Sequence, residues 1–145
     1  MKQRFVESPT KWKQKMARVL VVDDNAEERR MYATMLYYNG FDVLEAEDAI
    51  AGLELARDEQ PDLILMDYRL PRLDGLLAAE ILQAIPETSA IPVLCLTGFN
   101  VDGDRARASG CRAVLAKPTR PHELINAVRR WLDDRPDQAD GSPRL

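Results

Sequence analysis

The chain has 145 residues, of which 46% are apolar and 30% are charged, the balance of one ordinary globular domain. No apolar run approaches the roughly 18 residues of a membrane span, and the basic N-terminus lacks the apolar stretch of a secretory signal. Residues 1–18 hold six Lys and Arg against one Glu, a charge of +5; since the total is −4, the rest carries −9. So acidic a globule is a poor nucleic-acid binder, and we expect neither nucleic acid nor membrane as a partner.

Three parts follow one another along the chain. Residues 1–16 show no regular period and are interpreted as a basic arm, residues 17–133 as one domain, and the polar residues 134–145 as a frayed tail. Within the domain, short apolar runs alternate with helical patterns. The runs predict strands over Val19–Val22, Asp42–Ala46, Leu63–Met66, Pro92–Leu96 and Ala113–Ala116. The patterns between them predict helices over Ala26–Asn39, Ala49–Glu59, about Leu76–Ile85, Asp102–Ser109 and His122–Asp133.

Local signals support these boundaries. Asn25 and Asp48 precede the first two helices as capping residues, Gly40 ends the first helix, and Pro61 stops the second. The strands are continuous apolar runs, which indicates a parallel sheet buried on both faces. Five successive strand–helix units predict right-handed crossovers and a three-layer, doubly wound α/β fold.

Polar residues stand where the predicted strands end. Asp23 and Asp24 follow the first strand, Asp67 the third, Thr97 the fourth and Lys117 the fifth. Ligands of doubly wound sheets bind beyond these carboxyl ends, so the five side chains are expected on one rim. Two carboxylates ~5 Å apart repel by roughly 3 kcal/mol at an effective dielectric constant of ~20. Lys117 offsets part of this repulsion, and a hard cation, Mg²⁺ or Mn²⁺, would offset the rest.

The stretches VLVVDDN, LILMDYRLPRLDG, VLCLTG and VLAKP together resemble the receiver domain of two-component response regulators, over about residues 17–133. The resemblance implies a flavodoxin-like (βα)5 sandwich with a parallel sheet of order 2-1-3-4-5. It implies that Asp67 accepts a phosphoryl group from a histidine kinase or a histidine phosphotransfer protein. It also implies that Asp23, Asp24 and Asp67 hold Mg²⁺, Asp24 directly and Asp23 through water.

Further roles follow from the same resemblance. The backbone carbonyl of Arg69 would bind the metal, Thr97 would bond to the transferred phosphoryl group, and Lys117 would pair with a phosphoryl oxygen. Pro118 resembles the family's cis-proline, a bond type that proline permits. The protein would be a single-domain response regulator, a cytoplasmic signalling switch rather than a metabolic enzyme. We expect a monomer or weak homodimer that acts on an unidentified downstream protein.

One residue and one stretch depart from the family pattern, and two further residues bear on the lifetime of the phosphorylated form. Val114 stands where the family carries a Tyr or Phe whose ring swings on activation, so a different output mechanism is expected. The short stretch between Thr97 and Lys117 predicts a reduced fourth helix. Arg69 and Phe99 flank the path of the hydrolytic water in the family, and we predict that they make the phosphoaspartate long-lived.

Other classes of protein share part of this sequence pattern. An aspartyl phosphatase would need a second acid at position 69, where Arg69 stands, and a flavodoxin-like nucleotide binder would need a Gly-rich loop after the first strand. A receiver fragment of a larger regulator and a non-phosphorylated interaction module are the remaining alternatives. Tyr32, Tyr37 and Tyr38 are either partly buried or form a contact patch for the kinase. The only histidine, His122, lies outside the strand ends, so the phosphoryl donor would be another protein.

Overall fold

The computed structural model describes residues 16–98 and 100–133. In this part of the chain the strands form one parallel sheet of order β2-β1-β3-β4-β5, which confirms the predicted topology. The strands are β1 (Arg18–Val22), β2 (Asp42–Ala46), β3 (Leu63–Asp67), β4 (Val93–Thr97) and β5 (Ala113–Ala116). The helices are α1 (Ala26–Tyr38), α2 (Ala49–Glu59), α3 (Gly75–Ala84), α4 (Gly103–Ala108) and α5 (Pro121–Asp133). Every predicted bound lies within one residue of the observed one.

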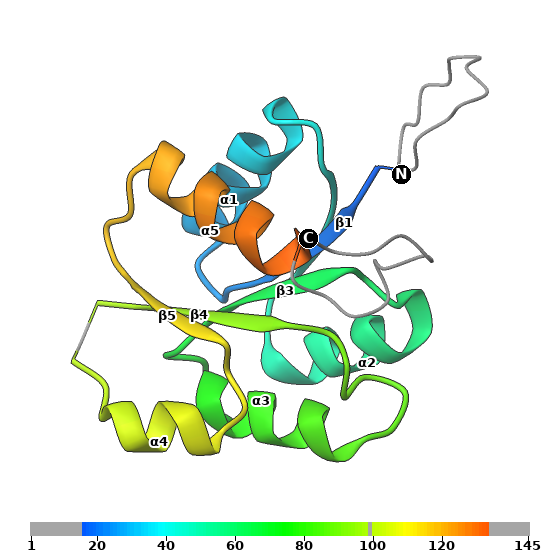
Figure 1. Cartoon of the computed structure of the whole chain (residues 1–145), viewed down its shortest axis with the longest axis vertical. Helices are drawn as coiled ribbons and strands as arrows, with labels where there is room; N and C mark the ends of the chain where they lie inside the picture. Colours follow the sequence, from blue (N-terminus) through cyan, green and yellow to red (C-terminus); the bar gives the residue numbers. More distant parts are fainter. Residues whose placement is uncertain (1–15, 99, 134–145) are drawn as a thin grey trace.

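The sheet lies between two layers of helices (Figure 1), and a hydrophobic cluster fills each of its faces. Successive strand residues point to opposite faces, so Val19 and Val21 of β1 pack toward α1 and α5, whereas Leu20 and Val22 pack toward α2 and α3. The strands β3 and β4 are buried along their whole length. This burial explains why the central runs are continuously apolar rather than alternating, and it fixes the direction in which each strand delivers its last residue.

Side-chain caps fix the starts of the helices. Asn25 accepts a hydrogen bond from the backbone N–H of Glu28 at 2.9 Å, and Asp48 accepts one from Ala51 at 2.8 Å, as the sequence predicts. Asp74 caps α3 in the same way, which starts that helix at Gly75. Each cap follows directly on the loop that leaves a strand end, so the caps also set the course of the loops around the site.

The α4 side of the sheet is thinly covered. The helix α4 has six residues, of which only Ala106 is buried, so the predicted reduction of the fourth helix is confirmed. Val114 of β5 lies on this side with 39% of its surface exposed. A small cluster around Leu76, Cys95 and Ala106 is the packing beneath α4, and the two cysteines are free thiols.

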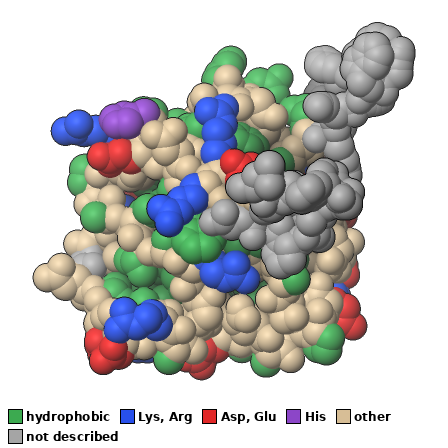
Figure 2. Space-filling view, in the orientation of Figure 1, with side chains coloured by type: hydrophobic (Ala, Val, Ile, Leu, Met, Phe, Trp, Pro, Cys, Tyr) green, Lys and Arg blue, Asp and Glu red, His purple; other side chains and the backbone are tan. Residues whose placement is uncertain are grey.

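The surface on the α5 and β5 side is mixed in character. Lys and Arg side chains lie apart from one another on this face, with hydrophobic and neutral groups between them (Figure 2). No helix among the described residues is long and apolar enough to span a bilayer. The predicted arm, except Met16, and the predicted tail lie outside the described residues.

Candidate functional site

Three carboxylates meet at the carboxyl ends of β1 and β3. These strands are neighbours in the sheet, and Asp23, Asp24 and Asp67 each place a carboxylate oxygen within 4.8 Å of the others. Asp23 and Asp67 are 1% and 5% exposed, whereas Asp24 is exposed to solvent. The structure therefore gathers the three acids that the sequence placed on one rim, and it buries two of them.

Lys117 reaches the same cluster from β5. Its Nζ lies 2.8 Å from Oδ1 of Asp67, and its backbone N–H donates to the carbonyl of Thr97 at 2.8 Å. Thr97 ends β4 and is 4% exposed, and the Lys117–Pro118 peptide bond is cis, as the sequence predicts. All five strand-end residues named from the sequence thus lie at one edge of the sheet.

Burial perturbs the charges of these groups. Burial raises the pKa of Asp23 to about 6, although a hydrogen bond from the backbone N–H of Asn25 opposes this shift. Burial also raises the pKa of Asp67, against the hydrogen bond from Lys117. For Lys117 burial lowers the pKa, but hydrogen bonds to Asp67 and Glu28 outweigh it and the pKa is raised. Several carboxylates therefore lie close together in a buried place, and the ammonium group of Lys117 offsets only part of the cost of ionising them.

One oxygen of the cluster suggests what completes it. Oδ1 of Asp23 accepts the Asn25 N–H at 2.9 Å, whereas Oδ2 is buried without a hydrogen-bond partner among the described residues. A buried, unpartnered carboxylate oxygen is costly, and it lies beside two further carboxylates. An all-oxygen set of this kind fits a hard divalent cation such as Mg²⁺. Asp24 and Arg69 also line a hollow of about 380 Å³ next to the cluster.

Gly75 lets α3 approach the site closely. A Cβ atom at this position would lie 2.3 Å from the backbone carbonyl oxygen of Asp67, which no side chain tolerates without a shift. The N–H of Gly75 donates to the carbonyl of Tyr68 at 2.8 Å, which ties the start of α3 to the segment after β3. Gly75 therefore belongs to the support of Asp67, a role that the sequence analysis missed.

Two residues of α1 also escaped the sequence analysis. Glu28 places Oε1 2.8 Å from Nζ of Lys117, so the lysine contacts two carboxylates. Arg29 donates to the backbone carbonyl of Asp23 at 2.8 Å and to Glu45 at 3.0 Å, which holds the loop after β1 in place. Neither contact has a sequence signal, because both residues fit the polar first turn of an ordinary helix.

Two further residues from the sequence analysis lie elsewhere, and a third lines the hollow beside the cluster. Val114 is exposed on β5, and His122 is exposed in the first turn of α5. Arg69 is exposed in the segment after β3. Phe99 lies outside the described residues, so the structure does not place it.

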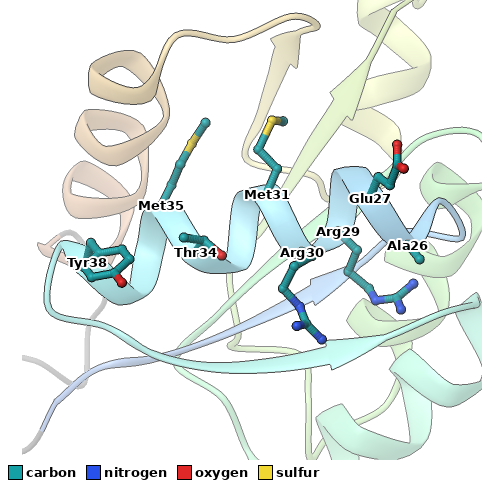
Figure 3. A pocket seen from close by; sticks show the side chains of 8 residues that line it. All are labelled: Ala26, Glu27, Arg29, Arg30, Met31, Thr34, Met35 and Tyr38. Carbon is teal, nitrogen blue, oxygen red and sulfur yellow. The ribbon is translucent and has the colours of Figure 1, made fainter.

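The outer face of α1 carries exposed apolar side chains. Tyr32 is buried at 2% exposure, whereas Tyr37 and Tyr38 are 58% and 78% exposed and form an edge-to-face pair 5.4 Å apart. A groove runs along this helix, and its side chains come from successive turns (Figure 3). It is lined by Ala26, Glu27, Arg29, Arg30, Met31, Thr34, Met35 and Tyr38. Each of the two interpretations therefore holds for part of the set: Tyr32 is buried, whereas Tyr37 and Tyr38 are available for contact.

A parallel (βα)5 sheet whose edge holds an acidic cluster, a buried strand-end aspartate, a threonine and a lysine defines a receiver-type domain. Comparison with known proteins agrees, because the family of response regulator receiver domains matches residues 19–129. The chain is 33% identical over 118 residues to the polar-differentiation response regulator DivK of Brucella anthropi, which covers 80% of this chain and 96% of that protein.

Solved structures show the same fold. A CheY-like receiver domain protein from Methanospirillum hungatei superimposes with a TM-score of 0.80 at 24% identity and covers 86% of this chain and 99% of its own. The receiver domain of the sensor histidine kinase PA1611 from Pseudomonas aeruginosa, solved with a magnesium ion in its active-site cleft, reaches 0.75 at 32% identity, covering 81% and 98%. The chain belongs to the response regulator receiver domains of two-component signalling, which confirms the sequence interpretation.

Proposed function

We propose that this protein accepts a phosphoryl group on Asp67 from the phosphohistidine of a histidine kinase or phosphotransfer protein, with Mg²⁺ held by Asp23, Asp24 and Asp67. The observation that carries the proposal is the contact of 2.8 Å between Lys117 and a buried aspartate that shares its edge of the sheet with two further acids. That arrangement supplies a nucleophile, a metal-binding set and a cation at one point.

The chemical step places a carboxylate oxygen of Asp67 on phosphorus. The new O–P bond forms as the N–P bond of the donor breaks, and that electron pair returns to the donor imidazole nitrogen. Lys117 favours the ionised form of Asp67 before transfer and would then face the phosphoryl oxygens. Mg²⁺, when bound, supplies positive charge to the oxygens of the transferred group.

The response after transfer rests on β4 and β5. The phosphoryl group adds up to about two negative charges and new acceptor oxygens. The Thr97 hydroxyl would turn to one of these oxygens, and the backbone bond between Thr97 and Lys117 links the two residues that bind them. A shift of this kind biases the neighbouring surface, where α4 is short and Val114 is exposed. We infer that a downstream protein reads this surface.

The donor would approach along α1. The exposed apolar groups of this helix, among them Met31 and Tyr38, flank a groove and lie on the helix whose first turn carries Glu28 (Figure 3). Exposed aromatic and methionine side chains are typical of protein-contact surfaces. This surface therefore supports a protein donor rather than a small metabolite as the natural phosphoryl source.

The test is phosphorylation by acetyl phosphate, followed by intact-protein and peptide mass spectrometry. We expect one phosphoryl group in the presence of Mg²⁺ or Mn²⁺ and none with a chelator present. Asp67→Asn should abolish the modification and keep the fold, whereas Asp58→Asn, a change at an exposed acid of α2, should leave it intact. A phosphoryl group on any residue other than Asp67 would contradict the proposal.

We further propose that Arg69 and Phe99 slow hydrolysis of the phosphoaspartate. Arg69 is exposed at the hollow beside Asp24, where its guanidinium would reach toward a transferred phosphoryl group. Replacing Phe99 by Glu and Arg69 by Asn should shorten the lifetime, measured by loss of label after removal of the donor. An unchanged lifetime in the double variant would refute this role.

A further inference from the structure

Lys117 is shared between two acids before any phosphoryl group arrives. Its Nζ lies 2.8 Å from Oδ1 of Asp67 and 2.8 Å from Oε1 of Glu28. The lysine side chain is 19% exposed and that of Glu28 39%, so the pair lies at the mouth of the site rather than in open solvent. Glu28 is not one of the acids that gather at the strand ends, and it reaches the site from α1, 89 positions away in the sequence.

The first turn of α1 fixes where Glu28 stands. Asn25 and Glu28 have the spacing of a capping box, in which the glutamate would reach back to the backbone N–H of the capping residue. Only half of that box forms, because Glu28 donates its N–H to the Asn25 side chain at 2.9 Å whereas the Asn25 N–H donates to Asp23 at 2.9 Å. The carboxylate of Glu28 is thus released from the capping role and turns to Lys117.

This contact bears on the reaction because Lys117 has to serve the phosphoryl group. An ammonium offers three donors, and two of them already bind carboxylates. The Glu28 side chain is 39% exposed, so solvent screens its ion pair with Lys117, and we expect Glu28 to contribute little to the stability of the fold. Its negative charge, however, lies one ammonium away from the place where the phosphoryl oxygens must settle.

We propose, on the basis of the proposed function, that Glu28 competes with the phosphoryl group for Lys117. This competition limits how readily Asp67 is phosphorylated. Before transfer the lysine bridges Asp67 and Glu28. After transfer Lys117 has to pair with the phosphoryl oxygens, and its ion pair with Glu28 opposes that change. Glu28 acts through Lys117 and is a positioning residue rather than a catalytic one.

The test is binding of beryllofluoride, a phosphoryl analogue, to the full chain with Mg²⁺, followed by NMR of the backbone amides around Asp67. Glu28→Gln keeps the size of the side chain and removes its charge, and it should tighten binding on the order of tenfold. Glu27→Gln removes the same charge from the neighbouring exposed position and should change the affinity by less than about twofold. Unchanged or weaker binding in Glu28→Gln overturns the inference.

A double-mutant cycle separates competition from simple repulsion. In a Lys117→Gln background, competition predicts that Glu28→Gln gives no further gain, because the shared cation is gone. The same gain in both backgrounds would mean that the charge of Glu28 acts through space, and it would overturn the inference. The proposed function has its own control: if the unmodified chain does not bind beryllofluoride, or if Asp67→Asn binds it equally well, that proposal fails. Binding that depends on Asp67 with no effect of Glu28→Gln refutes only the role of Glu28.

Discussion

The two sides of the site differ in how well they are packed. The firm side is formed by β1 with α1, and the loose side is formed by β5 with α4. The helices α1 and α5 have three and four buried residues, whereas α4 has Ala106 alone. Asp23 is 1% exposed and held through its backbone by Arg29, whereas Val114 of β5 is 39% exposed. Regions with few buried contacts open at low free energy. The acidic cluster therefore lies in the firm part of the molecule, and the part that we propose to respond to phosphorylation lies beside it.

The largest effect should come from the firm side. Leu124 of α5 is fully buried among the side chains of β1 and β3, so Leu124→Ala should lower the free energy of unfolding by about 2 to 5 kcal/mol. Urea denaturation followed by circular dichroism measures this loss. A loss below about 1 kcal/mol would mean that α5 is not the well-packed support that its burial indicates.

The next effect concerns the acid at the centre of the firm side. Burial raises the pKa of Asp23 from 3.8 to about 6, so folding favours its protonated form and the ionised form costs about 3 kcal/mol. Below pH 3.8 Asp23 is protonated in the folded and the unfolded state, so metal-free protein does not bear this cost. The folded state loses this free energy as the pH rises through 6. Asp23→Asn should therefore raise the free energy of unfolding by about 1 to 3 kcal/mol at about pH 7.5 with a chelator, and by nearly nothing at about pH 3.5.

Magnesium supplies the control for this prediction. A cation that binds the folded state alone stabilises it by about 1.4 kcal/mol at ten times its dissociation constant. Unmodified protein should gain this stability on addition of Mg²⁺, and Asp23→Asn should gain less. Equal gains in both proteins, measured by thermal unfolding, would show that Asp23 does not take part in binding the metal.

An effect of similar size is expected where α3 meets Asp67. Gly75→Ala places a Cβ against the backbone carbonyl of Asp67 and should cost about 1 to 3 kcal/mol while lowering the rate of phosphorylation by acetyl phosphate. Gly103→Ala is the matched change on the loose side, because a Cβ there would have only the flexible end of the Arg107 side chain within 4 Å. It should be neutral or stabilising by up to about 1 kcal/mol. Equal losses in the two variants would contradict the difference between the sides.

The smallest effect should be that of Val114. The side chain is partly exposed over the short α4, so Val114→Ala should change the free energy of unfolding by less than about 0.5 kcal/mol. Native-state hydrogen exchange gives a sharper measure, because amides of α4 should exchange through local opening at a lower free energy than amides of α5. Equal protection of the two helices would remove the basis of the comparison.

Much of the fold and the five strand-end residues were predictable because their signals are local. An apolar run, a capping residue such as Asn25 and a helix stop are set by neighbours in the chain, and the edge at which parallel strands end follows from the topology. The half-formed capping box was not predictable from the sequence. Its spacing fits a complete capping box, but Asp23, two residues before Asn25, competes with Glu28 for the same N–H, and the local sequence allows either acceptor.

By itself the sequence determined the order of the elements, the family and the set of residues that meet at the carboxyl edge of the sheet, since periodicity and strand ends are read along the chain. The tertiary structure decided which of those residues are buried, and therefore that the pKa of Asp23 rises while Asp24 stays exposed. It also decided that Lys117 serves Glu28 as well as Asp67. The reason is physical: desolvation and ion pairing depend on distances between segments far apart in sequence, which no local pattern specifies.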